Sequence, residues 1–124
     1  MLIIGTTVSA NAKQLQQRLD YRFADDRLVV LALSHRSFSA ANNERLEFLG
    51  DSILGAVVTD YLYQCFPNVR EGDLSRMRSA IVCGKSLAVV AKKFDLGPEL
   101  LLGSGEMKSG GNRRDSILGD TVEA

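Results

Sequence analysis

The segment NERLEFLGDS, at residues 43–52, constrains the fold most, because it opens the longest apolar-periodic stretch of the chain. In a helix, at about 100° per residue, Glu47 lies about 60° and Asp51 about 20° from the direction of Glu44. We therefore predict that three carboxylates share one face of a helix capped by Asn43.

The opposite side of this helix carries a narrow apolar stripe, which we expect to face a core. Its members are Leu46, Leu49, Ile53 and Val57. In the second half, Leu54, Val58, Tyr61 and Leu62 extend the apolar surface around the helix. A helix that is apolar nearly all round is central and covered. The acidic cluster is then largely enclosed, where unpaired carboxylates are costly and a positive charge should lie beside them.

The other predicted elements are helices as well. Cap residues and apolar spacing place them at 11–19, 25–35, 73–83, 85–94 and 114–124, with Asn11 and Asp73 as caps. The stretch at 96–114 carries five glycines and one proline, which indicates a long and functional loop. No alternating strand pattern of useful length occurs, so the predicted class is all-α, a compact multi-helix domain with a long central helix.

Composition sets the broad class. The 124 residues suit one globular domain, and 15 basic against 15 acidic residues give no global basic field. The opening MLIIG is too short for a signal peptide or a membrane span. Cys65 and Cys83 have no CxxC partner and are interpreted as reduced, buried thiols of a cytoplasmic protein.

A second acidic pair lies in the last predicted helix, where Asp120 and Glu123 share a face at i, i+3 spacing. If this helix meets the first one, Glu47, Asp51, Asp120 and Glu123 form four close carboxylates, with Glu44 near the rim. Hard oxygen ligands without His or Cys favour Mg²⁺ or Mn²⁺. Two such ions can activate water and stabilise an in-line phosphoryl displacement, so we expect phosphodiester hydrolysis.

Each of these residues also has a plain structural interpretation. Either acidic pair alone is as readily a solvated helix face, favoured by the helix dipole. His35 is interpreted as structural, and Glu71 as a neighbour of a helix cap. GSGEMKSGG lacks the glycine that precedes lysine in a P-loop, although Lys108 could still offer a point charge to a phosphate backbone.

Several blocks together resemble the ribonuclease III endonuclease domain. NERLEFLGDSIL is similar to the family signature, and four further blocks follow the family order. They are SHRS at 34–37, REGDLSRMR at 70–78, GEMKSGG at 105–111 and RRDSILGDTVEA at 113–124. The resemblance covers nearly the whole chain beyond the first dozen residues.

The resemblance implies an all-helical endonuclease that cleaves double-stranded RNA with Mg²⁺, leaves 5′-phosphate and 3′-hydroxyl ends, and serves ribosomal and messenger RNA processing in the cytoplasm. By motif position, the metal ligands and catalytic residues are Glu47, Asp51, Asp120 and Glu123. Glu44 and Glu71 match acids that assist RNA engagement or cleavage. The family acts as a homodimer, and Phe48 matches the aromatic residue that plugs the partner subunit.

Two departures from the family pattern stand out. Gly119 replaces a common alanine, at a helix cost of about 1 kcal/mol. The chain also stops one residue after Glu123, where relatives continue the helix and usually add a double-stranded RNA-binding domain. We therefore expect residues 1–124 to be a C-terminally truncated endonuclease domain, with weakened RNA affinity and a final helix prone to fraying.

Two other functions remain open from the residues. An all-α nucleoside triphosphate pyrophosphohydrolase also uses acidic i, i+3 pairs with Mg²⁺, but it would leave the SHRS and GEMKSGG blocks unexplained. A non-catalytic helical dimerisation or RNA-binding module would keep the fold without turnover. Metal dependence separates these cases.

Overall fold

The computed structural model describes residues 12–124, so the predicted cap Asn11 lies outside the described residues. Residues 12–19 are helical. The helices that follow are α2 (Asp26–Leu33), α3 (Glu44–Cys65), α4 (Glu71–Val82), α5 (Gly84–Lys93), α6 (Ser104–Lys108) and α7 (Asp115–Glu123), with short 3₁₀ turns η1 (Gly97–Glu99) and η2 (Gly111–Arg113). One isolated bridge, Ser34 to Leu101, is the only β pairing among residues 12–124. The all-α prediction is confirmed.

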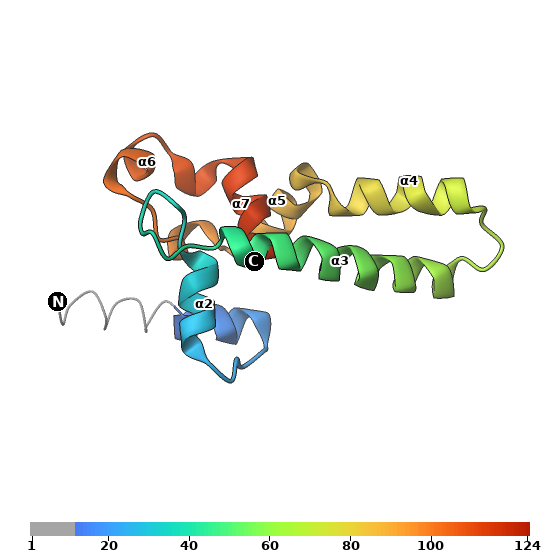
Figure 1. Cartoon of the computed structure of the whole chain (residues 1–124), viewed down its shortest axis with the longest axis horizontal. Helices are drawn as coiled ribbons and strands as arrows, with labels where there is room; N and C mark the ends of the chain where they lie inside the picture. The colour runs from blue at the N-terminus through green and yellow to red at the C-terminus, as the bar shows by residue number, and fades with distance from the viewer. Residues whose placement is uncertain (1–11) are drawn as a thin grey trace.

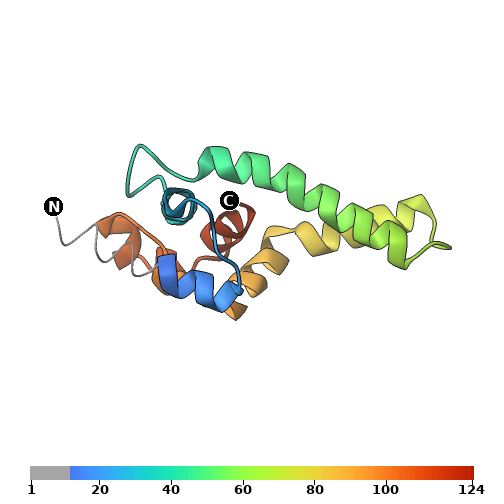
Figure 2. The ribbon, with the colours of Figure 1, turned by 90° about the horizontal axis from the view of Figure 1, so that it is seen from below.

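The long helix α3 leaves the body of the molecule as one arm of a hairpin. It runs outward, turns after Cys65 and is followed back by α4, as Figures 1 and 2 show. At the turn, the backbone N–H of Phe66 donates to the carbonyl of Leu62 and closes the helix. The body holds the remaining helices, so only the first part of α3 meets them.

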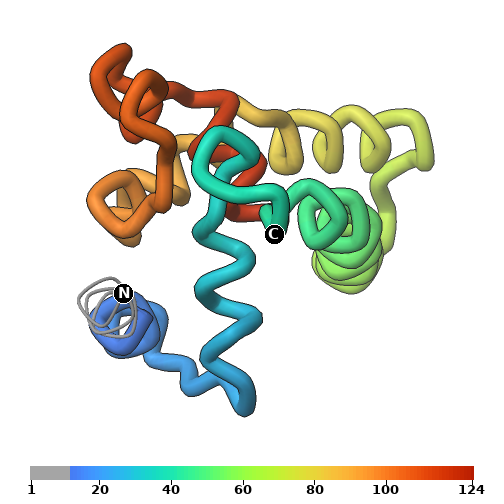
Figure 3. The backbone as a smooth tube through the Cα atoms, turned by 60° about the vertical axis from the view of Figure 1, so that its left-hand side comes forward, coloured from blue at the N-terminus to red at the C-terminus, as the bar shows by residue number. Residues whose placement is uncertain are grey.

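The hydrophobic core lies in the body, between the first helix, α2, α5, the segment after α5, and α7. In Figure 3, which views α3 nearly end-on, α2 connects the first helix to the region where α3 and α7 meet. The buried core residues are Ala12, Leu15, Val29, Leu33, Ala88, Ala91, Leu96, Leu100, Leu102, Ile117 and Leu118. None of them belongs to α3.

The prediction that α3 is enclosed is wrong for the described chain. Of its residues only Leu62 is buried, while Leu49 is 55%, Ile53 55% and Val57 61% exposed. The reason lies in the neighbours: α3 packs against α4 and α7, and no other described helix covers the face with the apolar stripe. Residues 12–124 therefore leave most of the apolar stripe of α3 exposed.

Several predicted helix boundaries shift for local reasons. Asn43 precedes α3, but its side chain donates to the carbonyl of Ala32, and the oxygen of Asn42 accepts from the N–H of Glu44 instead. Asp73 lies inside the first turn of α4, where it forms an ion pair with Arg76 of the same helix. Asn43 is therefore the N-cap residue of α3 as predicted, although its side chain makes no capping bond, and the predicted cap Asp73 lies three residues after the actual N-cap, Arg70.

Two further expectations are corrected. The predicted loop at 96–114 contains the turns η1 and η2 and the short helix α6, which fold it against the body. Cys65 and Cys83 are free thiols as predicted, but both are exposed because they lie at the ends of the two hairpin helices. In the part of the chain that the structure describes, no helix is long and apolar enough to cross a membrane.

Candidate metal centre

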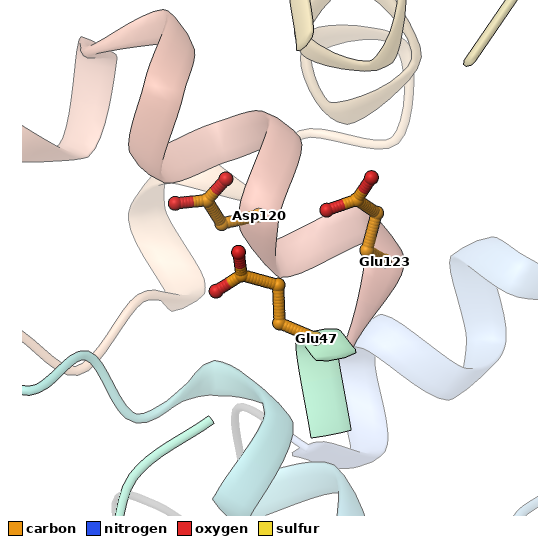
Figure 4. A group of neighbouring side chains, drawn as sticks. All are labelled: Glu47, Asp120 and Glu123. Atoms are coloured by element: carbon orange, nitrogen blue, oxygen red, sulfur yellow. The ribbon is translucent and has the colours of Figure 1, made fainter. Parts of the chain in front are cut away.

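Three of the predicted carboxylates converge where α3 meets α7. Glu47 extends from α3, and Asp120 and Glu123 extend from successive turns of α7 toward it, as Figure 4 shows. One carboxylate oxygen from each side chain lies within 4.8 Å of the others. This group, the carboxylate triad, brings acids from positions more than seventy residues apart into one site.

Gly50 makes this convergence possible. A β-carbon at this position would lie 1.6 Å from the backbone oxygen of Glu123, so the two helices cross in direct backbone contact. Gly50 is one helical turn after Glu47, and the crossing therefore brings the end of α7 beside Glu47. The glycine of the FLGDS segment is thus a requirement of the site geometry.

The contact between α7 and α5 depends on two glycines, Gly119 and Gly84. A β-carbon on Gly119 would lie 3.0 Å from the carbonyl oxygen of Gly84, the first residue of α5. Gly119 is buried, and α7 packs on α5 along this line. Gly119 therefore has a structural role beside its low helix propensity, because the absence of a side chain lets α5 and α7 approach closely.

Burial and mutual repulsion act together on the carboxylate triad. The pKa of Glu47 is raised, first by burial and then by the charges of Asp120, Glu44 and Asp51. Burial likewise raises the pKa of Glu123, and Asp51, Glu47 and Asp120 add to it. The site therefore carries more negative charge than its surroundings compensate.

Asp120 shows the same balance with one opposing neighbour. Burial raises the pKa of Asp120, while the charge that His35 can carry lowers it. Three hard oxygen ligands, without sulfur or imidazole among them, match the ligand preference of Mg²⁺ and Mn²⁺. The residues present therefore fit a divalent cation.

The other predicted acids lie at different distances from this triad. Asp51 is exposed and is not one of the three converging residues, but its charge raises the pKa of both Glu47 and Glu123. Glu44 lies at the start of α3, with an oxygen 4.0 Å from a guanidinium nitrogen of Arg36. The structure thus brings three of the four predicted ligands together and leaves Asp51 and Glu44 beside them.

Two other predicted residues lie away from the triad. Glu71 begins α4 at the far end of the hairpin, where it lines a separate pocket with Tyr63 and Arg78. Lys108 is exposed at the end of α6 and does not line the cleft beside the triad. Phe48 follows Glu47 in α3 and is 80% exposed, more than any other large apolar side chain among residues 12–124.

A cleft of about 670 Å³ opens beside the triad. One wall is the loop before α3, and the other is formed by α6 and α7. Its lining residues are His35, Arg36, Ser37, Asn43, Glu44, Glu47, Glu106, Arg114, Ser116, Ile117 and Asp120. Residue spacing did not predict this wall. In the sequence, the SHRS block is distinguished only by its place in the family order, whereas the cleft arises from long-range packing.

The loop with SHRS is held against the segment before α6 by backbone contacts. The N–H of His35 donates to the carbonyl of Leu101, and the N–H of Leu101 donates to Leu33. A β-carbon on Gly103 would lie 2.3 Å from the carbonyl oxygen of Ser37, so the two segments touch there. These contacts fix the cleft wall relative to α7.

An all-α body in which α3 and α7 bring three carboxylates together defines a helical protein with a candidate site for a divalent cation. The model of the Ribonuclease-III-like family matches residues 25–124. The ribonuclease 3 of Photobacterium profundum is 57% identical over 117 residues, and that of Idiomarina loihiensis is 60% identical over 111. The chain belongs to the ribonuclease III family.

A solved structure of the nuclease domain of ribonuclease III from Campylobacter jejuni is similar over most of this chain. It has a TM-score of 0.86 and 46% identity, and the match covers 89% of this chain and 78% of that one. The alignment with the Photobacterium protein covers 94% of this chain but 52% of that protein, and with the Idiomarina protein 90% and 48%. The chain thus spans about half the length of these relatives.

Proposed function

We propose that this chain is the endonuclease domain of a ribonuclease III, which cleaves double-stranded RNA by Mg²⁺-dependent phosphodiester hydrolysis. The observation that carries the proposal is the carboxylate triad, with Glu47, Asp120 and Glu123 within 4.8 Å across two helices. If the two acidic pairs were only solvated helix faces, nothing would require their carboxylates to lie so close together. Family membership favours this function over a nucleotide pyrophosphohydrolase.

In this proposal the triad holds the metal, and Asp51 adds charge or a ligand from the next turn of α3. The bound ion supplies positive charge that polarises the scissile phosphate and activates water. Raised carboxylate pKa values support a cation here, because a cation would offset the repulsion among these acids. Cleavage would leave 5′-phosphate and 3′-hydroxyl ends.

The cleft would receive one RNA strand beside the triad. Arg36 and Arg114 line it, and the side chain of Arg36 is 73% exposed, which leaves donors for a phosphate backbone. Lys108, on α6, would meet the backbone further out. We place the activity in cytoplasmic processing of ribosomal and messenger RNA.

A second copy of the chain is the partner that we propose for the exposed face of α3. Phe48 is exposed about 40° around the helix from Glu44, and the exposed stripe residues Leu49, Ile53 and Val57 lie on the side opposite Glu44. The similar structure from Campylobacter jejuni concerns flexibility in a region involved in dimer formation of its nuclease domain. A homodimer would carry two triads, one for each strand of a duplex.

The proposal is tested by incubating the chain with a long, perfectly paired RNA duplex in Mg²⁺ at low salt. We expect shortening of the duplex to small fragments with 5′-phosphates, and no shortening in EDTA. A nucleoside triphosphate serves as the alternative substrate. Hydrolysis of the triphosphate with an intact duplex would overturn the proposal in favour of a pyrophosphohydrolase, and metal-independent retention of uncut duplex would favour a passive binding module.

A further inference from the structure

The imidazole ring of His35 is held by a short chain of hydrogen bonds, which the sequence analysis did not predict. The N–H of Gly103 donates to the Ser37 hydroxyl oxygen at 2.9 Å, and that hydroxyl lies 2.8 Å from His35 Nδ1. The backbone N–H of Ser37 also donates to Nδ1, at 3.2 Å. The hydroxyl and the backbone N–H of Ser37 therefore both lie within hydrogen-bond distance of His35 Nδ1.

This arrangement determines which nitrogen carries the proton. Nδ1 accepts from the Ser37 N–H, so in the neutral ring it carries no proton, and the Ser37 hydroxyl donates to it. The neutral ring then has its proton on Nε2. Among the described residues, no hydrogen-bond partner for Nε2 occurs.

The position of the ring points to a use for this donor. His35 is half-buried and lines the cleft together with Glu47 and Asp120. It is close enough for its charge to act on the Asp120 carboxyl, lowering the pKa of that group. A fixed donor in a wall opposite acids, with both flanking segments pinned by backbone contacts, is a preorganised binding group.

The chemistry of the cleft selects the ligand class. An anionic strand next to three carboxylates is repelled unless donors on the other wall compensate. We propose that His35 Nε2–H donates to a phosphate oxygen of the RNA strand that lies beside the triad, and that Ser37 is the positioning residue that fixes the ring. The inference rests on the proposed function and names a substrate-binding residue within it.

The chain contains a single histidine, so its ring nitrogens can be observed by ¹⁵N NMR without assignment ambiguity. In the free wild-type chain, at a pH where the ring is neutral, we expect the pattern of a proton on Nε2 and none on Nδ1. Adding a short duplex RNA without divalent metal should shift the Nε2–H signal and slow its exchange with water. A ring unchanged by an RNA concentration that shifts backbone amides of the cleft would overturn the inference.

Kinetics on variants give the second test. His35→Ala should raise KM for duplex RNA by about ten- to a hundredfold and change kcat little, because a hydrogen bond to a charged group is lost from binding. His35→Gln, which returns a side-chain N–H near the position of Nε2, should recover most of the loss. Ser39→Ala, in the same loop, removes only a local bond to Ala41 and should cleave like wild type.

These outcomes separate the inference from the proposed function. Wild-type cleavage with His35→Ala at normal KM would overturn the role of His35 and leave the nuclease standing. If His35→Ala fails to fold, the kinetics of His35→Gln and the ¹⁵N spectrum of the wild-type chain still test the role of His35. If wild type cleaves nothing, the proposed function fails, and a shift of Nε2–H on RNA addition would still support His35 as an RNA contact.

Discussion

At the scale of single residues, the geometry of the site depends on Gly50. Gly50→Ala places a methyl group 1.6 Å from the Glu123 carbonyl oxygen, so α7 must move away from α3. We expect a loss of stability of at least about 1–3 kcal/mol in urea unfolding, the usual cost of overpacking, and a loss of RNA cleavage because Glu123 leaves the triad.

Gly55→Ala is the matched control in the same helix. A β-carbon there meets nothing within 4 Å, so the substitution should stabilise the chain by up to about 1 kcal/mol through helix propensity. Equal behaviour of the two variants would contradict the backbone crossing at Gly50.

The carboxylates also predict how the stability of the metal-free chain depends on pH. Burial raises the pKa of Glu123 in the folded state above its ordinary value of 4.5. Stability from this group is therefore fully present below its ordinary pKa and is lost as pH rises through the raised value. In EDTA, the stability of Glu123→Gln relative to wild type should rise across this interval, measured by urea unfolding at a series of pH values. A flat difference would show that Glu123 is not perturbed.

At the scale of elements, α3 shows what sequence periodicity predicts and what it misses. The spacing correctly predicted one long helix with Glu47 on its acidic face, and a second helix with Asp120 and Glu123. It could not predict that Leu49, Ile53 and Val57 stay exposed. Periodicity shows which residues share an apolar face, but it does not show whether another part of the same chain packs on that face. The convergence of the acids depends on a backbone crossing, which residue spacing along one helix does not encode.

The exposed face of α3 leads to a prediction about association. Phe48→Ala removes an aromatic side chain that is 80% exposed in one chain, and we expect it to shift a dimer toward monomer, as measured by light scattering over a range of protein concentrations. Val89→Ala is the control, since Val89 is 63% exposed on α5, outside the α3 face. A wild-type chain that is monomeric throughout, or an unchanged dimer mass for Phe48→Ala, would contradict the interface.

At the scale of the whole molecule, the body fixes α7 and the loop wall, and the α3–α4 hairpin extends from it (Figure 1). The sequence predicted the family and a group of four converging acids, and the structure brings three of them, Glu47, Asp120 and Glu123, within 4.8 Å. Glu71 illustrates the difference, since it matches a family position and yet lies at the far end of the hairpin from the triad. His35 illustrates the converse, because only the contacts of Ser37 and Gly103 reveal its fixed orientation.

The central claim is that α3 and α7 together form a divalent metal site, and isothermal titration of Mg²⁺, with Mn²⁺ in parallel, tests it most directly. We expect the wild-type chain to bind either ion, and Glu123→Gln to bind at least about tenfold more weakly, a difference of about 1.4 kcal/mol. Glu71→Gln, remote from the triad, should bind like wild type. Equal affinity of wild type and Glu123→Gln for both ions, or no binding by wild type at millimolar concentrations, would contradict the site.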